Sequence, residues 1–138
     1  MVLLVAAALL LAAVITFLAT RGSSTTDGSP SVAIQRFFDD LYAPDCVEKL
    51  PGDVDAASRP EVEALGSRIC SGRRNDPDPV DRLSFGRTAF TDPSHATVET
   101  TSHLKSGKTE DDNIATINEL GTWKVDYRAL TAVSRTGR

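Results

Sequence analysis

The sequence predicts an α+β domain that follows an N-terminal transmembrane helix. Its first twenty residues carry no charged side chain. Apolar residues recur at helical spacing between residues 30 and 70, and beyond the polar loop RRNDPDP at residues 73–79 they alternate with polar residues instead. A run of helices followed by a run of strands is typical of α+β proteins. We therefore expect about three helices packed on a curved, four-stranded antiparallel sheet.

The N-terminal segment has the length and composition of a membrane helix. Residues 1–20, MVLLVAAALLLAAVITFLAT, contain only two polar residues, Thr16 and Thr20. At about 1.5 Å rise per residue, a helix of this length reaches about 30 Å, the thickness of a bilayer's hydrocarbon core. The run is longer than the apolar region usual in a cleaved signal peptide, so a retained anchor is favoured over that alternative. We expect a single-pass protein of the cell membrane whose soluble domain lies outside the cytoplasm.

The soluble part begins with a linker and a capped helix. Residues 21–29, RGSSTTDGS, contain no hydrophobic residue, which is typical of a flexible linker. Ser29 can cap a helix whose first residue is Pro30. Four apolar residues then fall on one face of this helix: Ile34, Phe37, Phe38 and Leu41. We expect one domain over residues 30–130.

Two further helices carry the only two cysteines of the chain. A short helix after Asp45 contains Cys46. A longer helix starts at Ser58, with Glu61 completing a capping box, and has Cys70 in its last turn. An even number of cysteines in the soluble part favours a Cys46–Cys70 disulfide formed in an oxidising compartment. Two buried free thiols in a cytoplasmic domain are the alternative.

Four strands are predicted beyond residue 80. The first begins at Leu83, the second covers residues 96–104, and the third passes through Ile114. The turn NELG leads to the fourth strand, which has the following residues on one face: Trp123, Val125 and Tyr127. Residues 131–138 show no period and are expected to form a disordered tail.

Charge and motif content argue against several classes of function. The net charge of −4 falls on the soluble part, which argues against nucleic acid as a partner. The two cysteines are far apart, and His95 and His103 lie on a distant hairpin, so no short-spaced metal-ligand pattern is present. The sequence also lacks a phosphate-binding glycine loop and a serine-nucleophile motif. We expect no metal and no cofactor, and we assign no catalytic residue.

Three segments carry a resemblance to a known family: SVAIQRFFDDLYAPD, ATVETTSHLKSGKT and INELGTWKVD. With the order of elements, they make residues 30–130 similar to the nuclear transport factor 2-like (NTF2-like) superfamily, to which ketosteroid isomerase and scytalone dehydratase belong. The resemblance implies a cone-shaped fold whose pocket serves catalysis, ligand binding or protein contacts in different members. An anchor joined to such a domain is also similar to membrane-associated actinobacterial proteins, including those that accompany mammalian-cell-entry lipid-transport systems.

Alternation along the predicted strands selects the polar side chains that would line such a pocket. They are Arg87, Thr100, Ser102 and Tyr127, with Tyr42 added from the first helix. An unpaired charge is costly on the apolar face, so Arg87 is either an anchor for an anion or an arginine that reaches solvent. Gly86 can mark a bulge, which would shift the alternation at Arg87.

The same alternation disfavours an enzyme. Catalysis like that of ketosteroid isomerase needs a carboxylate base inside the pocket. Glu99, His103 and Asp126 are instead expected on the outer, solvated face. We therefore expect a non-enzymatic domain that binds a partner protein or an apolar ligand, for example as an accessory subunit of an envelope transport complex. The alternative is an isomerase- or dehydratase-like enzyme that uses the cone pocket.

Overall fold

The computed structural model describes residues 28–136, so the predicted transmembrane segment and most of the predicted linker lie outside the described residues. Its helices are α2 (Pro30–Leu41), α3 (Cys46–Lys49), the 3-10 helix η1 (Leu50–Asp53), α4 (Arg59–Arg74) and α5 (Tyr127–Thr136). Its strands are β1 (Val80–Asp92), β2 (His95–Leu104), β3 (Thr109–Glu119) and β4 (Thr122–Val125). None of the helices within residues 28–136 has both the length and the apolar character that a membrane crossing requires.

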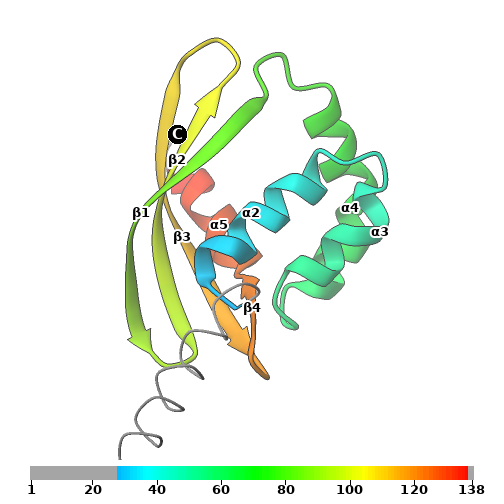
Figure 1. Ribbon diagram of the computed structural model, residues 1–138. Helices are drawn as coiled ribbons and strands as arrows, with labels where there is room; N and C mark the ends of the chain where they lie inside the picture. Colours follow the sequence, from blue (N-terminus) through cyan, green and yellow to red (C-terminus); the bar gives the residue numbers. More distant parts are fainter. Residues whose placement is uncertain (1–27, 137–138) are drawn as a thin grey trace, which may run out of the picture.

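The four strands form one antiparallel sheet in the order β1-β2-β3-β4. The helices lie on one side of this sheet, with α2 and α5 next to the strands and α3 and α4 further out (Figure 1). The predicted α+β class and the four-stranded antiparallel sheet are therefore confirmed. We call the sheet surface that faces the helices the inner face, and the opposite surface the outer face.

Helix α2 packs its apolar side against the inner face. It begins as predicted, because the hydroxyl of Ser29 accepts a hydrogen bond from the Val32 amide at 3.3 Å and Pro30 occupies the first turn. Each large apolar side chain that is fully buried contributes about 1.5–3 kcal/mol to stability. The core that α2 shares with the other elements includes Ile34, Phe37, Leu41, Leu50, Val54, Val62, Val98, Ile114 and Val125.

Helix α4 begins and ends differently from the prediction. Ser58 is its N-cap residue, but the buried hydroxyl accepts a hydrogen bond from the Arg128 amide at 3.3 Å instead of capping α4. Glu61 lies 3.9 Å from the Arg128 guanidinium, so the predicted capping box is absent. The start of α4 is thus tied to α5. The predicted last turn contains Cys70, but the helix continues one turn further, to Arg74.

The C-terminal segment is a helix and not the predicted tail. Strand β4 ends at Val125, and the side chain of Asp126 accepts a hydrogen bond from the Ala129 amide at 3.0 Å, which caps a new helix. Tyr127 is therefore the first residue of α5 and not part of the fourth strand. The prediction of a disordered tail is wrong as far as residue 136, because a carboxylate cap directly after a short strand allows a helix to start there.

A bulge in β1 decides which face Arg87 occupies. The register of β1 against β2 shifts between Phe85 and Thr88. The two residues between them, Gly86 and Arg87, therefore lie opposite a single residue, Glu99. The Arg87 side chain is 81% exposed, its Nε lies 3.8 Å from Oε1 of Glu99, and its amide donates a hydrogen bond to Oε2 at 3.2 Å. The predicted place of Arg87 in the pocket is therefore wrong, and the bulge at Gly86 is the reason.

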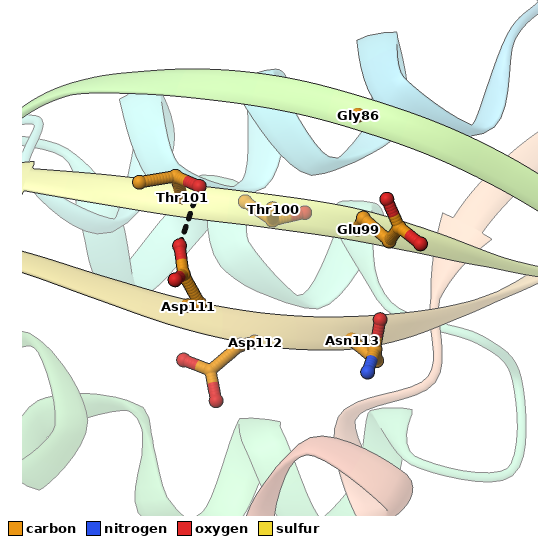
Figure 2. Close-up of a pocket in the computed structure, with 7 residues that line it drawn as sticks. All are labelled: Gly86, Glu99, Thr100, Thr101, Asp111, Asp112 and Asn113. Atoms are coloured by element: carbon orange, nitrogen blue, oxygen red, sulfur yellow. Dashed lines mark hydrogen bonds between the residues drawn. The ribbon is translucent and has the colours of Figure 1, made fainter.

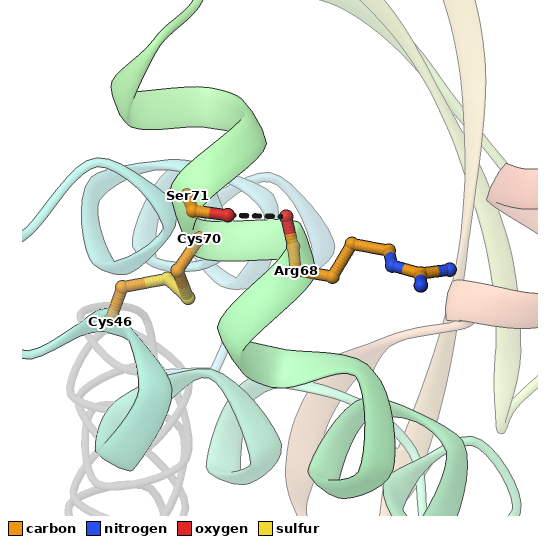
Figure 3. The surroundings of a disulfide bond; sticks show 4 residues. All are labelled: Cys46, Arg68, Cys70 and Ser71. Atoms are coloured by element: carbon orange, nitrogen blue, oxygen red, sulfur yellow. Dashed lines mark hydrogen bonds between the residues drawn. A yellow bond between two sulfur atoms is a disulfide. The ribbon is translucent and has the colours of Figure 1, made fainter.

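A disulfide joins α3 to α4, as the cysteine count predicts. Cys46 and Cys70 are bonded, their Cα atoms lie 6.0 Å apart, and both residues are buried. Figure 3 shows the bond bridging the two helices, next to a hydrogen bond of 3.2 Å from the Ser71 hydroxyl to the Arg68 carbonyl. The bond therefore fastens the outer helices to each other and does not connect them to the sheet.

A partly buried ion pair fixes α2 against η1 and β4. Nε of Arg36 lies 3.0 Å from Oδ1 of Asp53, and Nη2 donates a hydrogen bond to the Trp123 carbonyl at 3.2 Å. Asp53 is only 4% exposed, and its other carboxylate oxygen has no hydrogen-bond partner among the described residues. Burial, and then the adjacent carboxyl of Asp40, raise the pKa of Asp53 from 3.8 to about 7, although Arg36 acts in the opposite direction. A proton on Asp53 would allow this oxygen to donate a hydrogen bond to Asp40.

Candidate functional site

The helices and the inner face of the sheet border a cavity of about 230 Å³, which we call the inner cavity. It is lined by residues of α2, α4, α5 and strands β1 to β3. The apolar lining includes Phe37, Phe38, Leu41, Ile69, Ile114 and Leu130. The polar lining consists of Arg73, Ser102, Glu110, Asp112, Tyr127 and Thr131. Apolar walls with a few convergent polar groups are typical of a binding site for a small ligand.

Three residues of β2 and β3, Ser102, Glu110 and Asp112, contribute to the polar side of the inner cavity. Ser102 of β2 lies opposite Glu110 of β3, and Thr100 lies opposite Asp112. Both carboxylates are exposed, whereas Ser102 and Thr100 are buried. Neither Glu110 nor Asp112 forms an ion pair or a side-chain hydrogen bond with another residue in the described part of the chain. The mouth of the cavity therefore carries two carboxylates without a protein partner.

The two predicted hydroxyl residues of β2 differ in their hydrogen bonding. Oγ1 of Thr100 donates a hydrogen bond to the Val98 carbonyl of its own strand at 3.2 Å, and Thr100 does not line the inner cavity. Ser102 lines the cavity and is 7% exposed, yet its hydroxyl has no partner within residues 28–136. The Ser102 hydroxyl is not among the fully buried side-chain atoms that lack a partner, so a ligand or water in the cavity can reach it and form a hydrogen bond with it.

The two predicted tyrosines lie in different places, and α4 adds a charge that sequence analysis did not select. Tyr127, in the first turn of α5, lines the inner cavity. Tyr42 accepts a hydrogen bond from the Val80 amide at 3.3 Å and lines a separate groove between α2 and β1. Arg73 of α4 lines the inner cavity, but its guanidinium lies 3.7 Å from the Asp76 carboxylate. The only guanidinium among the described lining residues thus already has an anionic partner.

Glu110 and Asp112 are not among the predicted pocket residues, although the sequence contains a signal for them. The prediction for the third strand relies on Ile114 and does not extend back into the acidic run TEDDN. In the structure β3 begins at Thr109. Because side chains alternate along a strand, counting back from Ile114 by two and by four gives Asp112 and Glu110 on the inner face. An acidic stretch at a strand end is easily taken for a solvated turn.

A second hollow, of about 420 Å³, lies on the outer face over the bulge (Figure 2). Figure 2 shows Asp111 turned toward Thr101, whose hydroxyl donates a hydrogen bond to it at 2.6 Å, and Asp112 turned the other way. The described residues that line this hollow are polar apart from Gly86, so the hollow offers no apolar side chain to a ligand. We therefore take the inner cavity as the candidate site.

The described part of the chain contains one serine hydroxyl within hydrogen-bond distance of a histidine, and no metal cluster. Oγ of Ser84 lies 2.8 Å from Nε2 of His103 on the outer face. A serine nucleophile also needs a group that orients the histidine and donors for the oxyanion. No described residue binds Nδ1 of His103. Within residues 28–136, no group of three or more His, Cys, Asp or Glu side chains is placed to hold a metal ion.

Comparison with solved structures defines the fold class. A crystal structure from Campylobacter jejuni, described as a "Putative NTF2-like transpeptidase", matches with a TM-score of 0.53 and 11% sequence identity, over 70% of this chain and 96% of that chain. No protein-family profile matches the sequence, and no curated protein matches it significantly. The chain therefore has the NTF2-like fold that its sequence resemblance implies, and a likeness at this identity concerns the fold alone.

Proposed function

We propose that this chain is a membrane-anchored, extracytoplasmic domain that binds a small, largely apolar ligand in the inner cavity. The observation that carries the proposal is the cavity itself, which joins apolar walls to three polar side chains, Ser102, Glu110 and Asp112, that form no side-chain hydrogen bond or ion pair with another described residue. Such a combination is the usual starting point for assigning a binding site. The setting we favour is an envelope transport complex, in which the domain is an accessory subunit next to a partner protein.

The size of the inner cavity limits its ligand. Its volume of about 230 Å³ is below the roughly 300–1,000 Å³ typical of sites for drug-sized ligands. A ligand must therefore be small, or it must insert one end and leave the rest outside. The apolar walls favour the insertion of a hydrocarbon part, because its transfer from water is favourable by about 0.8 kcal/mol per buried methylene.

The proposed location is supported by two features. Residues 1–20 have the composition of a membrane helix, and the Cys46–Cys70 bond is of a kind that persists in oxidising compartments outside the cytoplasm. Both features are consistent with a domain held at the outer surface of a cell membrane.

An isomerase- or dehydratase-like enzyme is the second candidate, and the carboxylates of the inner cavity are the observation that favours it. Glu110 and Asp112 lie on the inner face, where such an enzyme needs a base. Both are exposed at the mouth, however, and no histidine is among the described residues that line the cavity. The transpeptidase named for the similar structure would need an activated nucleophile, and the Ser84–His103 pair lacks an orienting group. We therefore favour binding over catalysis.

The proposal is tested with the full chain in lipid nanodiscs, labelled with ¹³C at its isoleucine methyl groups. Ile69 and Ile114 line the inner cavity, whereas Ile34 is buried in the core, is not among the residues that line the cavity, and serves as an internal control. We expect n-butanol to shift the methyl resonances of Ile69 and Ile114 in a saturable way and to leave Ile34 unchanged. The variant Leu130→Trp, which fills the cavity, should remove the shifts. If n-butanol shifts the Ile69 and Ile114 methyl resonances equally in the native chain and in the Leu130→Trp variant, the proposal is contradicted.

A further inference from the structure

We infer that the ligand of the inner cavity carries a primary ammonium group, which Glu110 and Asp112 bind at the mouth, on an apolar stem that enters between the helices. This inference rests on the proposed function and adds the charge of the ligand to it. Three observations support it: the unpaired carboxylates of β3, the free hydroxyl of Ser102, and the apolar walls behind them.

The carboxylates of the two sheet faces differ in their partners. On the outer face, Glu99 pairs with Arg87, and Asp111 accepts a hydrogen bond from Thr101. On the inner face, Glu110 and Asp112 have no partner within the described residues. They are two positions apart on one strand, about 7 Å along the chain, so their negative charges repel each other. A cation bound between them would remove this repulsion, whereas an anionic ligand would add to it.

The number of hydrogen-bond acceptors at the mouth suits an ammonium group. Ser102 lies opposite Glu110 in the register of β2 against β3, on the same face as Asp112. The Ser102 hydroxyl, which lines the cavity, can accept a hydrogen bond, and each carboxylate accepts several. A primary ammonium has three N–H donors. One donor can therefore go to each of Glu110, Asp112 and Ser102, which would satisfy the hydroxyl that has no partner in the protein.

The cavity behind this mouth is suited to a hydrocarbon stem. Phe37 and Ile114 are almost fully buried, and with Ile69 and Leu130 they form an apolar wall beyond the polar rim. A ligand with a charged group at one end and a short aliphatic chain at the other places both parts in favourable surroundings. A bare inorganic cation would leave the apolar wall without contact.

The inference is tested with three probes that share a four-carbon stem: n-butylammonium, n-butanol and pentanoate. Each is titrated into the full chain in nanodiscs at low ionic strength, with the Ile69 and Ile114 methyl resonances as the readout. We expect n-butylammonium to bind roughly threefold to tenfold more tightly than n-butanol, since partly exposed ion pairs are worth up to about 1 kcal/mol each. Pentanoate should bind most weakly, and added salt should reduce the preference for the ammonium.

Paired variants separate the local carboxylates from the overall charge. The double variant Glu110→Gln with Asp112→Asn removes two charges at the mouth with little change in size. The control, Glu99→Gln with Asp111→Asn, removes two charges from the outer face. We expect the first variant to bind n-butylammonium and n-butanol equally well, and the control to keep the native preference.

Two outcomes contradict the inference in distinguishable ways. In the first outcome, the native chain binds all three probes equally, or the double variant Glu110→Gln with Asp112→Asn still prefers n-butylammonium to n-butanol. The cavity then binds ligands, but the assignment of an ammonium group is wrong. If none of the probes shifts the Ile69 and Ile114 resonances, the proposed function is wrong as well.

Discussion

Asp53 shows how one residue can make the stability of this domain depend on pH. It lies between a positive neighbour, Arg36, and a negative one, Asp40, and it is almost fully buried. Burial is the largest cause of its raised pKa, and Asp40 adds to it. The group therefore keeps a proton in the folded chain under conditions in which the unfolded chain has lost it.

The first prediction concerns this pH dependence. The folded pKa of about 7 lies above the unfolded value of 3.8, so the contribution of Asp53 to stability is fully present below about pH 4 and is lost as the pH rises through about 7. We expect the free energy of unfolding to decline across this window in the native chain. In the variant Asp53→Asn, which cannot titrate, the decline should be smaller. Chemical denaturation at several pH values measures both, and an unchanged decline in the variant would show that Asp53 is not its source.

Gly86 is a second residue whose identity is set by a close neighbour. A Cβ atom at this position would lie 2.8 Å from Oε2 and 3.1 Å from Cβ of Glu99. The carboxylate end can rotate away, but the Cβ atom of Glu99 is fixed by the backbone of β2. Gly86 is thus part of the bulge that turns Arg87 to the outer face.

The second prediction follows from this contact. Gly86→Ala should destabilise the domain by about 1–3 kcal/mol, the usual cost of overpacking. Gly72→Ala is the matched control, because nothing lies within 4 Å of a Cβ atom there and the residue is in helix α4. The control should be neutral or stabilising by up to about 1 kcal/mol. Equal effects of the two changes on the unfolding midpoint would show that the contact with Glu99 is unimportant.

Among the elements, α5 has two side chains that accept hydrogen bonds from the amides of its first turn, Asp126 and Ser58. Asp126 accepts a hydrogen bond from the Ala129 amide and follows directly after β4. The third prediction is that Asp126→Ala destabilises the domain by about 1 kcal/mol and that Asp126→Asn, which still caps, has a smaller effect. Hydrogen exchange at the α5 amides measures the fraying of the helix. If the alanine variant exchanges no faster than the native chain, the cap is not what holds α5.

The disulfide is the main covalent constraint on the outer helices. The fourth prediction is that Cys46→Ala with Cys70→Ala lowers the free energy of unfolding by about 3 kcal/mol, because the bond closes a loop of intermediate length. Reduction of the native chain should give a similar loss. An effect below about 1 kcal/mol in both experiments would show that the bond contributes little to this fold.

The elements that the sequence predicts well are those with local signals. Helix α2 is marked by Ser29, Pro30 and an apolar stripe, and its start is confirmed by the structure. The face of Arg87 depends instead on a register shift between two strands, and Asp126 caps a helix that follows the strand without a linker. Such features depend on neighbours in space, so alternation along one strand does not reveal them. The candidate site was predicted at Ser102 and Tyr127 but missed at Glu110 and Asp112 for a different reason. The predicted third strand did not extend back into the acidic run, although alternation from Ile114 places both residues on the inner face.

At the scale of the whole molecule, the two faces of the sheet serve different roles. The outer face is polar, and Glu99 and Asp111 have partners within the protein there. One part of the inner face packs against the helices in the hydrophobic core. Another part borders the inner cavity, where Ser102, Glu110 and Asp112 lie. This asymmetry is the physical basis for the proposed ligand site, and the NTF2-like fold supplies the helices that enclose it.

The most direct test of the central claim is native mass spectrometry of the full chain purified from its own membranes. The proposal predicts that a small molecule, able to place an apolar end in a space of about 230 Å³, is released from the native chain and is absent from the Leu130→Trp variant. A native chain without any bound small molecule, or the same molecule on both chains in equal amount, would contradict the claim that the inner cavity is a binding site.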